Sequence, residues 1–177
     1  MMVLAICGSL RTVSINRMLL HAAIRLSPPD MEIILSPVIG KLPLYNPDLE
    51  HCVPDQVAKF RAQVVDSQAL LIASPEYAHG VTGTLKNALD WLVSFEPFAN
   101  KPVALLNASP RAHHADAALR EILKTMSAEL VETASITVPL LGASLTEDEI
   151  AGHPEISIVI ANALLELQTY TIHRILR

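Results

Sequence analysis

The sequence has only two cysteines, Cys7 and Cys52, and they do not form a Cys-x-x-Cys pair. Neither a disulfide framework nor a cysteine metal site can therefore be argued from them. Cys7 lies within an apolar run and is expected to be an unreactive thiol in the core. The neighbouring His113 and His114 have no cysteine or histidine partner at ligand spacing, so a polar loop surface is favoured over a metal site.

Positively charged residues are also few. The chain has 13 Lys and Arg and 18 Asp and Glu, which gives a net charge of −5. This balance argues against a general nucleic-acid surface, although one local pocket can still be positive. The longest apolar stretch, residues 156–167, contains Asn162 and Glu166 and is too short to cross a bilayer. The N-terminus enters an apolar strand without a preceding basic region, so no signal peptide and a cytoplasmic location are expected.

Three nucleotide and hydrolase motifs are missing. The sequence has no G-x-x-x-x-G-K-[ST], no G-x-G-x-x-G after a strand and no G-x-S-x-G before a helix. These absences argue against a P-loop nucleotide hydrolase, a dinucleotide-binding Rossmann domain and an α/β-hydrolase. The chain is 51% hydrophobic and 18% charged, and its 177 residues suit one well-buried domain over residues 1–177.

Short apolar runs alternate with segments of helical periodicity along the chain. Strands are expected at Met2–Cys7, Met31–Pro37, Ala69–Ala73, Pro102–Ala108 and Thr133–Pro139. Helices are expected at Ser14–Leu26, Asp55–Asp66, Thr84–Phe95, Ala115–Leu130 and Pro154–Ile175, with a polar connection at Leu140–His153. Alternation of this kind predicts an α/β fold with a five-stranded parallel sheet covered on both faces, in the order 2-1-3-4-5.

The stretch Gly8–Asn16 reads as a turn from the first strand into the first helix. Gly8 permits a sharp exit from the strand, and Ser14 suits the helix N-cap. The unpaired N–H groups and positive dipole end of a helix N-terminus favour a phosphate, and Arg11 adds a fixed positive charge. An ordinary capped helix is the alternative interpretation.

Two further loops are expected at the same edge of the sheet. Ligands of open parallel sheets bind beyond the carboxyl ends of the strands, where the strand order reverses. Residues 8–14, 75–83 and 109–114 follow the adjacent strands one, three and four. Their convergence favours the phosphate interpretation. Within these loops, Glu76 is a candidate ion-pair partner of Arg11 or Arg120.

The motif Gly8-Ser9-Leu10-Arg11-x-x-Ser14-x-Asn16, followed by Pro75-Glu76-Tyr77 and by Leu85-Lys86-Asn87-Ala88-Leu89-Asp90-Trp91, resembles the NAD(P)H-dependent FMN reductase family. The resemblance covers residues 1–138 and implies a flavodoxin-like three-layer sandwich. It also implies FMN as cofactor, NADPH or NADH as electron donor, and a quinone, dye, metal oxyanion or free flavin as acceptor. It further implies a homodimer or homotetramer.

The resemblance assigns roles residue by residue. It implies that the FMN phosphate is held by Ser9, Arg11, Ser14, Ile15 and Asn16. It implies that the flavin is lined by Pro75, Glu76, Tyr77 and Ala78, and that Ser109 starts the third flavin loop. No side chain is assigned as catalytic, because the flavin carries the redox chemistry.

This sequence departs from the family pattern in two places. Ala78 stands where the family usually has Asn, and the third loop, Ser109–His114, lacks the usual Gly-Gly pair. A flavodoxin-like electron carrier and a flavin-free binding or regulatory protein therefore stay open as alternatives. The last helix is apolar over most of its circumference near its start, which indicates an additional contact with another subunit.

Overall fold

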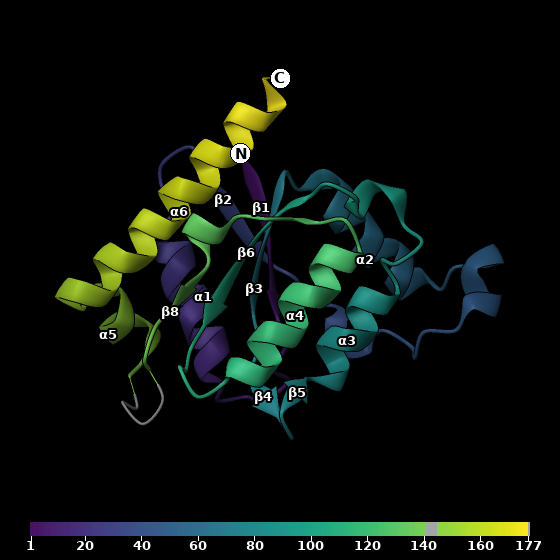
Figure 1. Ribbon diagram of the computed structural model, residues 1–177, viewed down its shortest axis with the longest axis horizontal. Helices are drawn as coiled ribbons and strands as arrows, with labels where there is room; N and C mark the ends of the chain where they lie inside the picture. Colours follow the sequence, from purple (N-terminus) through teal and green to yellow (C-terminus); the bar gives the residue numbers. More distant parts are fainter. Residues whose placement is uncertain (141–144, 177) are drawn as a thin grey trace.

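The computed structural model describes residues 1–140 and 145–176. Its parallel sheet has the order β2-β1-β3-β6-β7. On the same edge of β6, β7 pairs with the start of that strand and β8 pairs with its end. The strands are β1 (Met2–Cys7), β2 (Glu32–Leu35), β3 (Ala69–Ala73), β6 (Pro102–Asn107), β7 (Glu129–Leu130) and β8 (Ile136–Thr137). The predicted order is confirmed, with the two short strands β7 and β8 sharing the place expected for strand five (Figure 1).

Helices cover both faces of the sheet, as Figure 1 shows. The helices α1 (Ile15–Arg25), α5 (Glu147–Gly152) and α6 (Pro154–Ile175) pack on one face, and α2 (Asp55–Asp66), α3 (Gly83–Asp90) and α4 (His113–Thr125) on the other. Alternate residues of β1 enter the two cores: Ala5 joins the α1 and α6 side, while Leu4 and Ile6 join the opposite side. Burial on both faces explains why these strands are continuously apolar.

Several predicted elements are confirmed by the structure. The bounds of the first strand, of the third strand, of α2 and of α6 agree with the prediction. In α1, Ser14 is the N-cap, and its side chain accepts a hydrogen bond from the backbone N–H of Arg17 at 3.4 Å. Trp91, the last residue of the motif at residues 85–91, is completely buried.

The prediction for helix four, Ala115–Leu130, is wrong at its C-terminal end. Helix α4 ends at Thr125, and Ser127 follows with a φ of 59°. The N–H of Ala128 bonds to the carbonyl of Leu123 at 2.9 Å, which closes a Schellman motif. Ser127 takes the left-handed position usually filled by glycine, so the sequence offers no stop signal. The chain then forms β7 against β6.

Helix three was predicted to reach Phe95, but α3 ends at Asp90. The Arg61 guanidinium donates to the carbonyl oxygen of Trp91 at 2.7 and 3.0 Å, which satisfies a carbonyl at the helix end. Strand two, predicted for Met31–Pro37, is shorter at Glu32–Leu35. Strand four ends at Asn107, one residue before the prediction.

Two segments near the C-terminus differ from their predictions. The region predicted as strand five begins with a 3-10 helix, Glu132–Ala134, before the short β8. The predicted polar connection contains α5, which starts with a capping box between Thr146 and Glu149. Gly142, placed in that connection, lies outside the described residues. Among the residues that are described, no helix is both long and apolar enough to cross a membrane.

The long loop that follows β2 contains two 3-10 helices, Ile39–Lys41 and Pro47–His51. Two hydrogen bonds join this loop to α3. The Asn87 side chain accepts from the N–H of Tyr45 at 2.8 Å and donates to the carbonyl of Pro43 at 3.0 Å. The indole N–H of Trp91 also donates to the carbonyl of Pro43, at 2.8 Å.

Candidate functional site

A cavity of about 430 Å³ lies at the carboxyl ends of β1, β3 and β6. Its volume is within the usual range for small-molecule sites. All the predicted cofactor-binding residues except Ala78 line it: Ser9, Arg11, Ser14, Ile15, Asn16, Pro75, Glu76, Tyr77 and Ser109. Residues that the sequence analysis did not single out also line it: Ser74, Asn107, Ala108, Arg111 and Ala112. The three predicted loops therefore meet in one cavity.

The first loop presents donors around the N-terminus of α1. The N–H groups of Ile15 and Asn16 belong to the first helical turn, where no carbonyl of the same helix can accept them. The Ser9 hydroxyl oxygen accepts from the N–H of Arg11 at 3.4 Å, which folds the loop back toward the helix. Arg11 forms no ion pair within the described part of the chain. Together these groups suit a phosphate.

Asn16 carries an unsatisfied polar atom. The residue is 4% exposed, and its Oδ1 is buried without a hydrogen-bond partner among the described residues. A buried polar atom of this kind costs free energy unless a partner is supplied. Asn16 is among the residues that line the cavity, but its Oδ1 itself has almost no exposed surface there.

The second loop is a small hairpin of β4 (Glu76–Tyr77) and β5 (Gly80–Val81). Its two turn residues, Ala78 and His79, have φ values of 49° and 58°. Positive φ at both central positions is the signature of a type I′ turn, which matches the twist of the hairpin. Ala78 is thus a turn residue at the tip of the hairpin, and it does not line the cavity.

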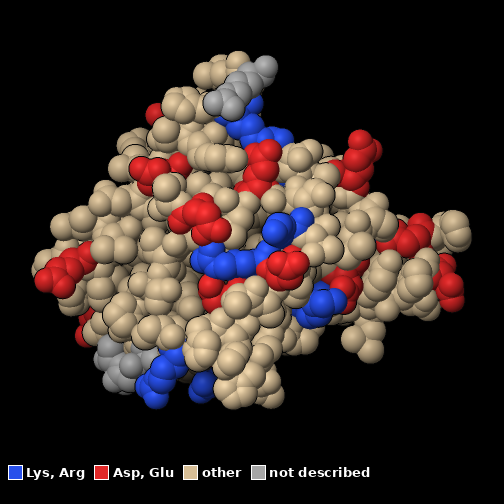
Figure 2. Space-filling model, in the orientation of Figure 1, with Lys and Arg blue, Asp and Glu red and all other residues tan. Residues whose placement is uncertain are grey.

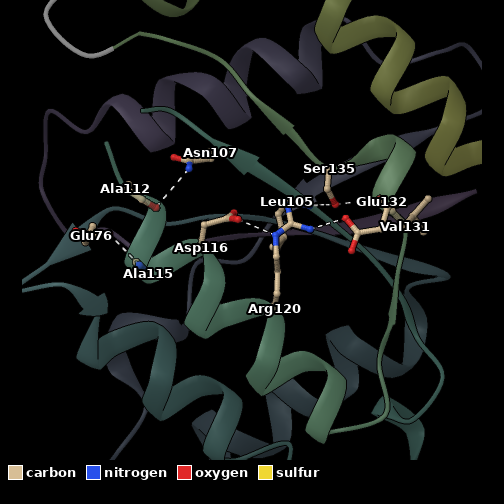
Figure 3. A network of polar contacts seen from close by, with 10 residues as sticks. All are labelled: Glu76, Leu105, Asn107, Ala112, Ala115, Asp116, Arg120, Val131, Glu132 and Ser135. Carbon is tan, nitrogen blue, oxygen red and sulfur yellow. Dashed lines mark hydrogen bonds and ion pairs between the residues drawn. The ribbon is translucent and has the colours of Figure 1, made fainter. Parts of the chain in front are cut away.

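The Glu76 carboxylate links this hairpin to α4 (Figure 3). Its Oε2 accepts from the N–H of Ala115 at 2.8 Å, in the first turn of α4, and its Oε1 lies 3.1 Å from Nδ1 of His79. The N-cap of α4, Ala112, has no capping side chain of its own. The Ala115 N–H holds the pKa of the Glu76 carboxyl below its usual value, and the nearby His114 acts in the same direction.

The expected pairing of Glu76 with Arg11 or Arg120 is wrong. Arg120 instead bonds Asp116 at 2.7 Å and Glu132 at 2.5 Å (Figure 3). The partner of Glu76 is instead the N-terminus of α4. That contact joins residues 39 positions apart in the sequence, and no local pattern marks it.

The third loop is ordered without glycine. The Asn107 side chain accepts from the N–H of Ser109 at 3.0 Å and donates to the carbonyl of Ala112 at 3.5 Å (Figure 3). The Ser109 hydroxyl oxygen accepts from the N–H of Arg111 at 3.2 Å. Asn107 was missed by the sequence analysis, although a polar residue at the end of an apolar strand is a usable signal.

Three histidines gather at the contact between the hairpin and α4. The rings of His79 and His114 are 4.4 Å apart, and those of His113 and His114 are 4.1 Å apart. Within residues 1–140 and 145–176, no group of three or more His, Cys, Asp or Glu side chains is arranged to hold a metal ion. The three rings contact one another where the hairpin meets the first turn of α4.

Comparison with curated proteins finds relatives over the N-terminal part of the chain. An NAD(P)H-dependent FMN reductase from Pseudomonas aeruginosa is 46% identical over 110 residues, which are 60% of this chain and 59% of that protein. A quinone reductase from Escherichia coli K12 is 36% identical over 111 residues, 60% of this chain and 59% of that protein. The chain thus matches about three fifths of the length of these curated relatives.

Among solved structures, the chain resembles the flavoenzyme NAD(P)H:(acceptor) oxidoreductase FerB from Paracoccus denitrificans. The TM-score is 0.77 and the identity 25%, over 94% of this chain and 95% of that one. The fold is therefore flavodoxin-like. The sequence profile of the NADPH-dependent FMN reductase family matches residues 1–140, which include all three loops of the cavity. On this match, the chain belongs to the NADPH-dependent FMN reductase family.

Proposed function

We propose that this protein is an NAD(P)H-dependent oxidoreductase that holds FMN in the cavity at the carboxyl edge of its sheet. One observation carries the proposal: the N-terminus of α1, capped by Ser14 and next to Arg11, borders a cavity that the two other loops also line. A phosphate-bearing ligand suits the positive dipole of that helix end and the charge of Arg11. Family membership supports flavin as that ligand.

Each loop has a distinct role in this proposal. Ser9, Arg11 and Ser14, with the N–H groups of Ile15 and Asn16, hold the phosphate by the charge and dipole of the helix end. The hairpin that contains Pro75, Glu76 and Tyr77, and the loop that starts at Ser109, border the ring and limit the access of water. Bound FMN supplies the acceptance of hydride from NAD(P)H and the transfer of electrons to an acceptor.

The chain's own contribution is to keep the ring-bordering loops in place. The contact of Glu76 with Ala115 holds the hairpin against α4, and the Asn107 side chain holds the third loop. Neither contact needs a proton to move during turnover. We therefore propose no catalytic side chain and assign these residues to positioning.

The acceptor class follows from the relatives. We propose quinones and free flavins because the curated relatives are named quinone reductase and NAD(P)H-dependent FMN reductase. Dyes and metal oxyanions are further acceptors to assay. We also propose that residues 1–177 act as one FMN-binding domain, in a cytoplasmic homodimer or homotetramer.

An absorbance experiment tests the proposal. The purified protein is mixed with FMN, passed through gel filtration, and then treated with NADPH or NADH without oxygen. Retained yellow colour that bleaches with a nicotinamide supports the reductase. Retained colour that does not bleach points to an electron carrier.

If no colour is retained, turnover of free FMN by the protein is measured with each nicotinamide. Turnover then identifies FMN as a loosely held substrate. Absence of turnover contradicts the proposal and leaves a flavin-free binding protein on the same fold. An Asn16→Leu variant, which removes the unsatisfied amide and keeps similar bulk, should lose FMN retention while it stays folded.

A further inference from the structure

The third loop brings a second arginine to the cavity. Arg111 lines it from this loop, as Arg11 does from the first. Arg111 is exposed, and within the described part of the chain its guanidinium forms no ion pair. At the lower edge of Figure 2, next to the place of the β4–β5 hairpin in Figure 1, Lys and Arg side chains appear without Asp or Glu beside them. The cavity thus carries positive charge on two of its loops, although the chain as a whole is acidic.

The backbone of the third loop fixes the place of Arg111. The N–H of Ala112 bonds to the carbonyl of Ser109 at 3.1 Å, and the Ser109 hydroxyl oxygen accepts from the N–H of Arg111 at 3.2 Å. Arg111 is therefore the third residue of a β-turn. Its φ is not positive, so the turn does not require glycine at this position. An arginine thus stands without backbone strain in the loop where the family usually has its Gly-Gly pair.

Glu76 does not neutralise Arg111. It is the one acidic residue among the described residues that line the cavity. Its Oε2 accepts from the N–H of Ala115 at 2.8 Å, and its Oε1 lies 3.1 Å from Nδ1 of His79. The carboxylate is therefore bonded to the N-terminus of α4 and to the hairpin, and it pairs with neither arginine of the cavity. A guanidinium without a counter-charge in a partly enclosed cavity favours an anionic ligand.

FMN accounts for only one of the two arginines. Its charged group is a single phosphate, which suits the N-terminus of α1 beside Arg11. Because β3 lies between β1 and β6 and neighbouring strands are about 4.8 Å apart, the first and third loops leave the sheet about 10 Å apart. A phosphate at α1 therefore leaves Arg111 for a different anionic group. The nicotinamide donor brings such a group to the same cavity, because a diphosphate joins its two nucleotides.

We propose that Arg111 binds the diphosphate of the NADH or NADPH donor. This role rests on the proposed function, and it adds a residue that selects the donor by its phosphate groups. The diphosphate is remote from the ring that gives up hydride, so Arg111 contributes to binding and orienting the donor. The protein should therefore favour donors that carry the diphosphate over donors that carry the nicotinamide ring alone.

The first test compares two hydride donors. NADH carries the diphosphate, whereas 1-benzyl-1,4-dihydronicotinamide carries the same reacting ring without any phosphate. In Arg111→Gln, the ratio of kcat/KM for NADH to that for the benzyl donor should fall by about 10-fold or more, because a charge-assisted contact is lost. Lys124→Gln is the matched control, since it removes an exposed positive charge from the far end of α4 and should keep the wild-type ratio. An unchanged ratio in Arg111→Gln overturns the proposal.

The second test measures binding without turnover. ADP-ribose has the diphosphate but no nicotinamide, and its Kd is measured by isothermal titration calorimetry with and without FMN. Arg111→Gln should raise this Kd by about 10-fold or more, and Lys124→Gln should not. If the Kd for FMN itself rises in Arg111→Gln as much as in Arg11→Ala, Arg111 belongs to the FMN phosphate site and the proposal is overturned.

Failure of the Arg111 role is distinguishable from failure of the proposed function. A chain that binds ADP-ribose through Arg111 but accepts hydride from neither donor contradicts the proposed function alone. A chain that oxidises both donors with the wild-type ratio in Arg111→Gln contradicts the Arg111 role alone. A loss confined to an anionic acceptor, 1,4-naphthoquinone-2-sulfonate beside neutral 1,4-naphthoquinone, assigns Arg111 to the acceptor and likewise overturns the proposal.

Discussion

The hydroxyl of Thr82 donates a hydrogen bond to the carbonyl oxygen of Gly8 at 2.7 Å, between residues 74 positions apart. The same hydroxyl oxygen accepts from the N–H of Leu85 at 3.3 Å and caps α3. Thr82 is 3% exposed, so both bonds lie in the interior. One side chain thus joins the first loop of the cavity, the end of the hairpin and the start of α3.

Replacement of Thr82 by Val should destabilise the protein and loosen the cavity. Val keeps the shape but removes the donor and the cap, which leaves the Gly8 carbonyl unsatisfied in the interior. We expect a loss of about 2–3 kcal/mol in the free energy of unfolding and weaker FMN retention. Denaturant unfolding of Thr82→Val beside Thr82→Ser measures this, since Ser keeps the hydroxyl. Equal losses in the two variants would refute the role of the hydroxyl.

Gly8 should not tolerate a side chain. A Cβ at position 8 would lie 2.2 Å from Ser74 Oγ and 2.6 Å from Ser74 Cβ. We expect Gly8→Ala to cost about 1–3 kcal/mol of stability. The double variant Gly8→Ala with Ser74→Gly removes the clashing atoms and should recover part of that loss relative to Ser74→Gly alone. A purely additive double-mutant cycle would exclude this contact as the cause.

The turn at Ala78 and His79 should be open to stabilisation. Ala78 has a φ of 49°, a conformation that Asn adopts more readily than Ala. We expect Ala78→Asn to raise the free energy of unfolding by about 0.5–1 kcal/mol and Ala78→Val to lower it. Because Ala78 does not line the cavity, the FMN dissociation constant should change little. Thermal unfolding and FMN titration of both variants check this.

Glu76 should make stability depend on acid pH. Its folded pKa lies below the usual 4.5 because it accepts from the N–H of Ala115. A depressed folded pKa contributes stability above the unfolded pKa, and that contribution is lost as the pH falls through the folded pKa.

Thermal unfolding of wild type and Glu76→Gln from pH 7 to pH 3 measures this dependence. The wild type should have the higher Tm at pH 7, and the difference should shrink below about pH 4.5. Other carboxylates, such as Glu50 beside Arg61, are present in both proteins and cancel in the comparison. A Tm difference that stays constant over this range would show that Glu76 keeps its usual pKa.

Arg11 should contribute to FMN affinity through the phosphate. If its guanidinium binds the phosphate dianion, Arg11→Ala should weaken FMN binding by about 1.5–3 kcal/mol, or about 10- to 150-fold in Kd. The loss should be much smaller for riboflavin, which lacks the phosphate. Arg25→Ala, at the opposite end of α1 and paired with Asp148, is the control and should leave Kd unchanged. Equal weakening for riboflavin and FMN would remove Arg11 from the phosphate site.

Local patterns in the sequence predicted much of the fold. The apolar runs at Met2–Cys7 and Ala69–Ala73 and the helical spacing of Asp55–Asp66 predicted elements with the bounds that the structure has. The reason is that burial on two faces or on one stripe leaves a direct periodicity in the residues. The end of α4 could not be predicted in this way, because Ser127 occupies a left-handed position for which glycine is the usual sequence signal.

The sequence by itself determined which residues face the cavity from the first loop, because Ser9, Arg11, Ser14 and Asn16 sit in one local turn before a helix. Only the tertiary structure decided that Asn107 orders the third loop, that Glu76 caps α4 and that Ala78 lies in a turn away from the cavity. These facts depend on contacts between residues far apart in the chain or on backbone angles that several residue types can adopt. Periodicity and turn chemistry depend on residues close together in sequence, whereas the packing of the sheet determines which distant residues come into contact.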